Sequence, residues 1–317
     1  MILLDIIRWK GCFMKPIVIK ELVDAQIPYN IGMSEKTSAL FEGAVYMFKP
    51  AEIGLNGYEA TSESEYIGSH IYQILDIPAH ETLLVMYKGR PGVFCKDFIA
   101  NSKDDLVLYE FASIAKDYFI KEGISSPHLS REKVALSQVL QVLNQADYFK
   151  RIREEVKDHF WKMFILDSFI ENYDRHIGNW GYILNRNTGD ISIAPIYDCA
   201  GSFNPQRDDD YLMEILAEKP GTFLYNLEFT YQTSALRDNN PNIKMTLQHV
   251  ISNLQEFGCI KAIQEIVPKI ESKMAYIIEM IDSIEMLSDA RKEYIKTTLK
   301  YRLDNILVPA YKKAIEL

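Results

Sequence analysis

The spacing of apolar residues changes near residue 100, and this change restricts the folds that the chain can adopt. Before that point, short runs rich in β-branched and aromatic residues predict strands, at 16–22, 44–49, 81–88 and 93–98. The last two flank the turn "GRPG" and are expected to form a hairpin. Residues 61–76 predict one helix, because their apolar positions recur at helical spacing.

Helical periodicity dominates the rest of the chain. It covers 105–121, 131–149, 150–171, 243–257, 259–285 and 287–315. The exception is 180–197, where "WGYIL", "NRNTGD" and "ISIAPIY" predict a second hairpin. We therefore expect an α+β fold of two lobes, with a small β-rich N-lobe at 1–98 and a large, mainly helical C-lobe at 99–317. The junction at 95–100 is a candidate hinge, and clefts between lobes are favoured ligand sites.

The composition is that of a globular protein and excludes several classes of partner. Of the 317 residues, 48% are hydrophobic, which supplies an ample core. The net charge of −9 argues against broad electrostatic attraction to nucleic acid or to an anionic membrane. The four cysteines are too far apart in sequence to suggest a disulfide framework.

The N-terminal run "MILLDIIRWKGCF" is apolar but is interrupted by Asp5 and Arg8. It is too short to span a bilayer and lacks the clean apolar centre of a signal peptide. Together with the scattered cysteines, this predicts a cytoplasmic protein.

The stretch "FIENYDRHIGNWGYIL", residues 169–184, gathers reactive side chains where the helix meets the second hairpin. Asp174 precedes Asn179 by five positions, the spacing between the catalytic Asp and a metal-binding Asn in protein kinases. The hairpin leads on to Asp198, where kinases carry another metal ligand. A polar turn is usually only a turn. The ordered set nevertheless favours phosphoryl transfer, with Asp174 as the catalytic residue and Asn179 and Asp198 as ligands of Mg²⁺.

Arg175 and His176 lie beside the catalytic position in the sequence. We expect Arg175 to neutralise nearby carboxylates and His176 to support the catalytic loop through hydrogen bonds. A zinc site built from Asp174, His176 and Asp198 is the alternative, although no H-E-x-x-H or comparable spacing supports it.

Lys49 ends the predicted strand "AVYMFK" and is the candidate for holding nucleotide phosphates. The alternative is a strand-end lysine whose charged end simply reaches solvent. Glu65, on the predicted helix, is the candidate ion-pair partner of Lys49. The run "SESE" at 62–65 also fits a capping box, in which Glu65 would bond back to the start of the helix.

A phosphate-binding loop is expected before the strand that carries Lys49. The polar segment "IGMSEKTSALFEG" at 31–43 stands there, without a G-x-G-x-x-G or Walker A sequence. Backbone N–H groups of such a loop can hold a phosphate with few glycines. The candidate nucleotide-binding residues in it are Gly32, Ser34, Lys36 and Thr37, and the alternative is an ordinary polar loop.

Taken in order, "GMSEKTSAL", Lys49, "SESEYIG", "CKDF", "NYDRHIGNWGYI" and "APIYDCAGSF" resemble the HipA-like serine/threonine kinases, and within them a short subgroup. The resemblance spans about 29–204. It implies a two-lobed, protein-kinase-like fold that uses ATP with Mg²⁺ and transfers phosphate to a protein Ser or Thr. It also implies that adenine contacts the hinge residues Cys95, Lys96, Asp97 and Phe98, and it makes an antitoxin-like or host protein a candidate partner.

Two other functions remain open at this level. Phosphoinositide kinases share the Asp-Arg-His-x-x-Asn loop, so a lipid or small-molecule kinase is one alternative. A nucleotide-binding module without turnover is the other. The first differs from a protein kinase in what receives the phosphate, and the second transfers no phosphate.

Overall fold

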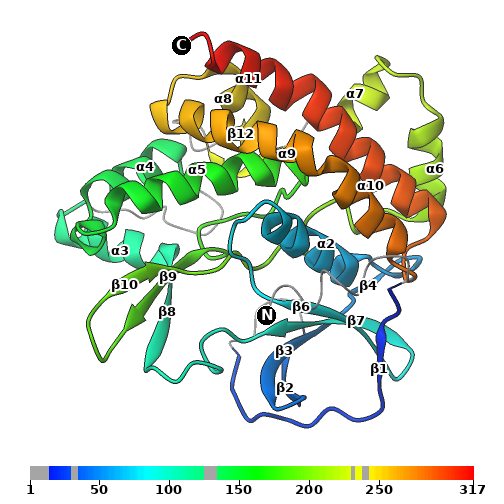
Figure 1. The fold of residues 1–317 in the computed structure, drawn as a ribbon, viewed down its shortest axis with the longest axis horizontal. Coiled ribbons are helices and arrows are strands. Elements are labelled where there is room, and N and C mark those ends of the chain that lie inside the picture. The colour runs from blue at the N-terminus through cyan, green and yellow to red at the C-terminus, as the bar shows by residue number, and fades with distance from the viewer. Residues whose placement is uncertain (1–13, 30–34, 125–133, 230–232, 238–242) are drawn as a thin grey trace.

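The structure is a computed structural model of the 317-residue chain. It describes residues 14–29, 35–124, 134–229, 233–237 and 243–317. In Figure 1 a curled sheet built from the first hundred residues lies below, and a group of helices from the rest of the chain lies above it. The predicted mixed fold with a β-rich first part and a mainly helical second part is confirmed.

A five-stranded sheet forms the first part. Its strand order is β1-β6-β7-β3-β2, where β1 and β6 are parallel and the other neighbours antiparallel. The strands are β1 (Ile17–Ile19), β2 (Thr37–Phe41), β3 (Ala44–Pro50), β6 (Thr82–Tyr87) and β7 (Arg90–Lys96). The predicted strands and hairpin are therefore present. The segment expected to be a phosphate loop differs, because its second half is β2, paired with β3.

Alternation along β3 separates two environments. Phe48 packs with Tyr46 and Phe94 in an apolar cluster on one face of the sheet. Side chains alternate between faces, so Lys49 points to the opposite face. That face is covered by helix α2 (Thr61–Ile74), the helix predicted over 61–76, which packs against β6 and β7. A short hairpin, β4 (Ile53–Gly54) and β5 (Gly57–Tyr58), connects β3 to α2.

A second, three-stranded sheet follows, in the order β10-β9-β8. Strands β9 (Gly181–Asn185) and β10 (Ile191–Ile193) form the predicted second hairpin. The prediction of a helix over 105–121 is wrong in its first part, because β8 (Leu106–Glu110) pairs with β9 along its whole length and only α3 (Phe111–Lys121) is helical. Partner strands far along the chain thus override local periodicity.

Helices make up most of what remains. They are α4 (Leu136–Gln145), α5 (Arg153–Phe169), α6 (Asp209–Ala217), α7 (Phe223–Phe229), α8 (Leu247–Asn253), α9 (Phe257–Ser283), α10 (Asp289–Arg302) and α11 (Val308–Ala314). A 3-10 turn (Asp147–Phe149) follows α4, and a π-helical turn (Leu303–Leu307) joins α10 to α11. The helix expected over 243–257 starts later than predicted, because β12 (Lys244–Thr246) pairs with β11 (Thr233–Arg237).

Helix α5 runs through the middle of the helical part and ends at the catalytic-loop stretch. Its last two turns are buried on all sides, from Met163 to Phe169, and α9 packs along it. Because α5 is fixed by this core, the residues that follow it have a rigid attachment. No helix in the described part of the chain is long and apolar enough to cross a membrane.

A network of buried polar side chains connects Glu171, just after the end of α5, to helix α10. Glu171 accepts hydrogen bonds from Arg302 Nη2 at 3.2 Å, Asn204 Nδ2 at 3.1 Å and the Tyr294 hydroxyl at 3.2 Å. Burial raises the pKa of Glu171 to about 7, although Arg302 opposes the shift and Glu228 adds to it. A protonated carboxyl in this network is thus favoured below neutral pH.

The network predicts a pH-dependent stability. The pKa of Glu171 is about 7 in the fold against an ordinary value of 4.5, so its contribution to stability is fully present below pH 4.5. It is lost as the pH rises to about 7, a change on the order of 3 kcal/mol. Denaturant unfolding from pH 5 to pH 8 should show the wild type losing stability relative to Glu171→Gln up to about pH 7, and no further above it. Parallel curves across the range would contradict this assignment.

Candidate active site

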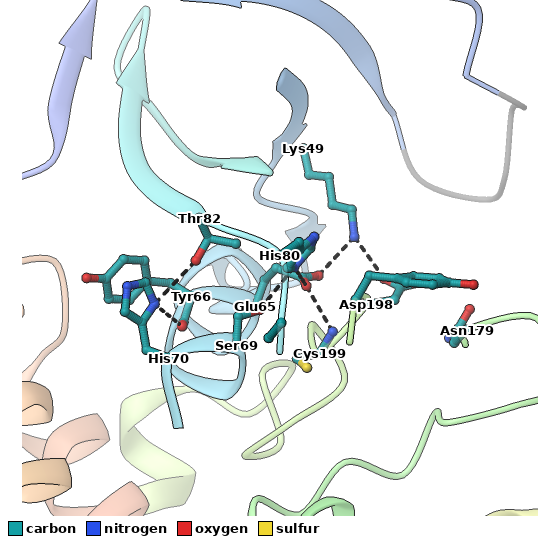
Figure 2. A network of polar contacts seen from close by, with 12 residues as sticks. Lys49, Glu65, Tyr66, Ser69, His70, His80, Thr82, Asn179, Asp198 and Cys199 are labelled. Atoms are coloured by element: carbon teal, nitrogen blue, oxygen red, sulfur yellow. Dashed lines mark hydrogen bonds and ion pairs between the residues drawn. The ribbon is translucent and has the colours of Figure 1, made fainter. Parts of the chain in front are cut away.

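A three-residue ion cluster lies between the five-stranded sheet, α2 and the segment after β10. Lys49 Nζ is 2.9 Å from Glu65 Oε2 and 2.9 Å from Asp198 Oδ1. Figure 2 shows Lys49 descending from β3 toward both carboxylates, with Asp198 between it and Asn179. Glu65 lies 16 positions and Asp198 lies 149 positions from Lys49 in the sequence, yet both carboxylates bind the same Lys49 nitrogen atom.

Glu65 is fully buried and bonded at both oxygens. Its Oε2 accepts from Lys49, and its Oε1 accepts from the backbone N–H of Cys199 at 3.0 Å and lies 2.9 Å from His80 Nε2. The capping-box alternative is wrong, since α2 begins after Ala60 and shows no side-chain cap bond within the described part of the chain. The strand-end alternative for Lys49 also fails, because this side chain is buried and ion-paired.

The charges of this cluster stabilise one another. Burial alone would lower the pKa of Lys49, but the carboxylates of Asp198 and Glu65 outweigh it and hold the pKa well above its usual value. Burial alone would raise the pKa of Glu65 and of Asp198, but Lys49 lowers both. All three groups are therefore ionised at neutral pH. Burial of such a set is tolerated only because each charge is paired.

Helix α2 packs closely against the turn at Asp198 and Cys199, called here the Asp198 corner. This close approach requires a glycine. A Cβ on Gly68 would lie 2.6 Å from Cys199 Cβ, closer than side-chain carbons can stand. This contact lets the Cys199 N–H reach Glu65 one turn away on the helix. Asp198 itself has a φ of 61°, a left-handed backbone conformation that is uncommon outside glycine and is found at strained functional positions.

Arg175 holds the catalytic-loop residues in position. Its guanidinium is buried and bonds Asp167 on α5 through Nε at 2.9 Å. Its Nη1 donates to the backbone oxygens of Asn179, at 2.7 Å, and of Tyr197. One side chain thus ties α5, the loop and the residue before Asp198. The expected neutralisation of nearby carboxylates by Arg175 corresponds to its ion pair with Asp167. Its bonds to the two backbone oxygens are an additional role.

The three other loop candidates, Asp174, Asn179 and His176, are held by hydrogen bonds within the loop. Asp174 is exposed, and its backbone oxygen accepts a hydrogen bond from Asn179 Nδ2 at 2.9 Å. This bond turns the amide nitrogen of Asn179 into the loop. His176 Nδ1 accepts from the backbone N–H of Gly178 at 3.1 Å, which is the loop-supporting contact expected for it.

The two nucleotide-loop candidates that the structure describes, Lys36 and Thr37, line one groove. Thr37 is the cross-strand partner of Phe48, so it shares the face opposite Lys49 and lines a separate groove of about 580 Å³ with Tyr87 and Arg90. Lys36 lies one residue earlier, and its charge helps to lower the pKa of Asp198. Lys36 also lines the groove of Thr37, and its charge extends to Asp198. Gly32 and Ser34 lie outside the described residues.

The hinge candidates are found at the end of β7. Cys95 is buried and pairs across the sheet with Met47, on the same face as Lys49. Lys96 forms an exposed ion pair with Glu81 at 2.9 Å. The Asp97 carboxylate accepts from two following backbone N–H groups, at 2.8 Å each. Phe98 lies near the ring of Tyr197, with centroids 6.2 Å apart, so the hinge contacts the residue before Asp198.

His80 joins the cluster although the sequence did not point to it. It is 4% exposed, and its Nε2 lies 2.9 Å from Glu65 Oε1 and 3.0 Å from Ser69 Oγ (Figure 2). Because an ionised Glu65 only accepts hydrogen bonds, Nε2 carries a proton and donates it. Isolated histidines are usually structural, and nothing in the sequence around His80 indicated a contact with α2.

Fold and site together define a two-lobed, protein-kinase-like architecture, and sequence comparison names the family. Residues 31–273 match the family described as the HipA-like C-terminal domain. The chain belongs to this family.

Individual relatives agree. The chain is 30% identical to the serine/threonine-protein kinase CtkA of Helicobacter pylori strain J99, over 89% of this chain and 83% of that protein. It resembles the crystal structure of the H. pylori proinflammatory kinase CtkA with a TM-score of 0.84 and 27% identity, covering 96% of this chain and 100% of that one. HipA in a complex with HipB and operator DNA from Shewanella oneidensis MR-1 shares the fold, with a TM-score of 0.55, 13% identity and coverage of 99% and 72%.

His80 is expected to act by positioning Glu65. We predict that His80→Ala lowers the rate of phosphate transfer from ATP about tenfold, because a hydrogen bond to a buried charge is lost. His80→Gln should recover part of that rate, since its amide nitrogen can donate to Glu65. Thermal unfolding of both variants serves as the control. Equal rates in the two variants, or loss of rate only in step with loss of stability, would count against a positioning role.

Proposed function

We propose that the protein is a serine/threonine protein kinase of the HipA type, which uses ATP with Mg²⁺. The observation that carries the proposal is the ion cluster of Lys49, Glu65 and Asp198 beside the loop that holds Asp174 and Asn179. Its family relative CtkA is named a serine/threonine-protein kinase, which supports a protein hydroxyl as the acceptor. The lipid-kinase alternative rests on the Asp-Arg-His-x-x-Asn loop, which does not distinguish one phosphate acceptor from another.

The residues present fit a magnesium ion. Asp198 offers a carboxylate that is half-buried, and Asn179 offers an amide oxygen whose nitrogen is engaged with Asp174. Hard oxygen donors of this kind suit Mg²⁺, whereas zinc sites prefer nitrogen and sulfur ligands. When bound, the ion would neutralise charge on the phosphates during transfer.

Each remaining residue has a defined task in this proposal. Lys49, kept ionised by its neighbours, binds phosphate oxygens, and Glu65 fixes its direction. Asp174 is exposed, so the hydroxyl of a protein substrate can reach it and transfer its proton to the carboxylate. Lys36 adds positive charge on the phosphate side. Adenine is assigned to the backbone at Cys95–Phe98, as in other kinase hinges.

A protein partner in addition to the substrate is part of the proposal. The Shewanella HipA structure contains HipB. By analogy, we assign this chain an antitoxin-like or host protein as a partner, which co-purification from its native cells would identify.

Phosphate transfer is the direct test. Purified protein is incubated with labelled ATP, Mg²⁺ and a cell lysate, with proteins, lipids and metabolites separated afterwards. We expect label on protein Ser or Thr, and a reduction of about 10²–10⁴-fold in Asp174→Asn because the proton acceptor is lost. Asp198→Asn should be at least as impaired, because the proposed metal ligand is weakened.

The matched control is Asp190→Asn, which removes an exposed carboxylate in the turn between β9 and β10. It should label proteins as the wild type does. Label confined to lipids or metabolites would replace the protein-kinase assignment. No label in any fraction, with ATP bound in calorimetry, would indicate a nucleotide-binding module without turnover.

A further inference from the structure

A polar groove opens between the β4–β5 hairpin and the segment that follows the Asp198 corner. Its volume is about 370 Å³, and both walls contribute side chains, among them Tyr58, Glu59, Gln206 and Arg207. The walls are bonded to each other, through Ala60 N–H to the Pro205 oxygen at 3.0 Å and through the side chains of Asn56 and Asp208. The groove is therefore a formed feature of this fold.

One wall of this groove is bonded to the catalytic loop. Gln206, on one wall, bonds the hydroxyl of Tyr173, which immediately precedes Asp174. The segment leading into that wall also packs on Asp174, since a Cβ on Gly201 would lie 3.0 Å from Asp174 Cβ. A polypeptide that presents a hydroxyl to Asp174 thus has this groove beside it.

Glu59 is the distinctive group in the groove. Its Oε2 is closed off from solvent and has no hydrogen-bond partner among the described residues, while the side chain as a whole stays partly exposed. Burial and the neighbouring Glu52 raise the pKa of Glu59. A carboxylate oxygen that is both buried and unbonded is uncommon, because the ionised group loses its hydration without compensation. The rest of the Glu59 side chain is partly exposed and lines the groove, so a cation there would pair with the carboxylate charge.

Neighbouring charges reinforce this end of the groove. Burial raises the pKa of Tyr173, and the carboxylates of Asp174, Glu59 and Glu52 add to the shift. The negative charges of these three carboxylates are therefore concentrated around Tyr173. The cation in the groove wall, Arg207, lies over the ring of Tyr211 at 4.4 Å.

We propose that Glu59 is a specificity-determining residue that binds a basic side chain of the protein substrate close to the phosphorylated Ser or Thr. An arginine suits it best, because a guanidinium can bond a carboxylate through two N–H groups at once. The inference rests on the proposed kinase function and adds the substrate class: Ser or Thr with a nearby arginine or lysine.

Peptide kinetics test the inference. The substrates are serine peptides that carry arginine, alanine or glutamate at one position, scanned from four residues before to four residues after the serine. For the wild type we expect the best arginine peptide to exceed its alanine counterpart in kcat/KM about tenfold or more. Glu59→Gln should reduce that ratio to near one, mainly through KM. Glu59→Lys should favour glutamate peptides.

The control variant is Glu271→Gln, which removes an exposed carboxylate on α9 away from the groove. It should keep the wild-type ratio, and thermal unfolding should show all variants folded. A wild type that phosphorylates arginine, alanine and glutamate peptides equally would overturn the inference while the kinase function stands. A preference that persists in Glu59→Gln would do the same. Absence of phosphate transfer to every peptide and to lysate protein would reject the kinase function itself.

Discussion

The contact of Lys49 with Glu65 and Asp198 is the interaction on which the site depends. It joins a strand, a helix and a loop at one nitrogen atom, each bond being 2.9 Å long. Ions taken from water to such a position cost several kcal/mol each, and only their pairing offsets this. The cluster is therefore stable only when α2 and the Asp198 corner are both in place.

Neighbouring groups make that arrangement the stable one. Glu65 is held at its second oxygen by His80 and by the Cys199 N–H, so it cannot turn away from Lys49 without leaving buried donors unpaired. Gly68 admits Cys199 against α2. Arg175 fixes the loop of Asn179 to the residue before Asp198. Helix position and loop position are thereby coupled through the site.

Local sequence predicted the elements that carry their own signal. The hairpins at β6–β7 and β9–β10 have turn residues between alternating strands, and α2 has strict helical spacing. It failed for β8, which is a strand because β9 lies beside it, and for β12, which needs β11. The second half of the expected phosphate loop was likewise a strand, and its pairing turned Thr37 to the face away from Lys49.

What the sequence by itself determined is the set of chemical groups and their order: Lys49, Glu65, Asp174, Asn179 and Asp198, with the spacing of a kinase catalytic loop. It also left two incompatible roles for Glu65, because the run "SESE" at 62–65 fits a capping box and Glu65 also fits an ion pair with Lys49. Only the tertiary structure decided between them and added His80 and Glu59. The reason is physical. Whether a polar atom is hydrogen-bonded or buried without a partner depends on residues from distant parts of the chain that pack beside it. Local periodicity does not specify which residues those are.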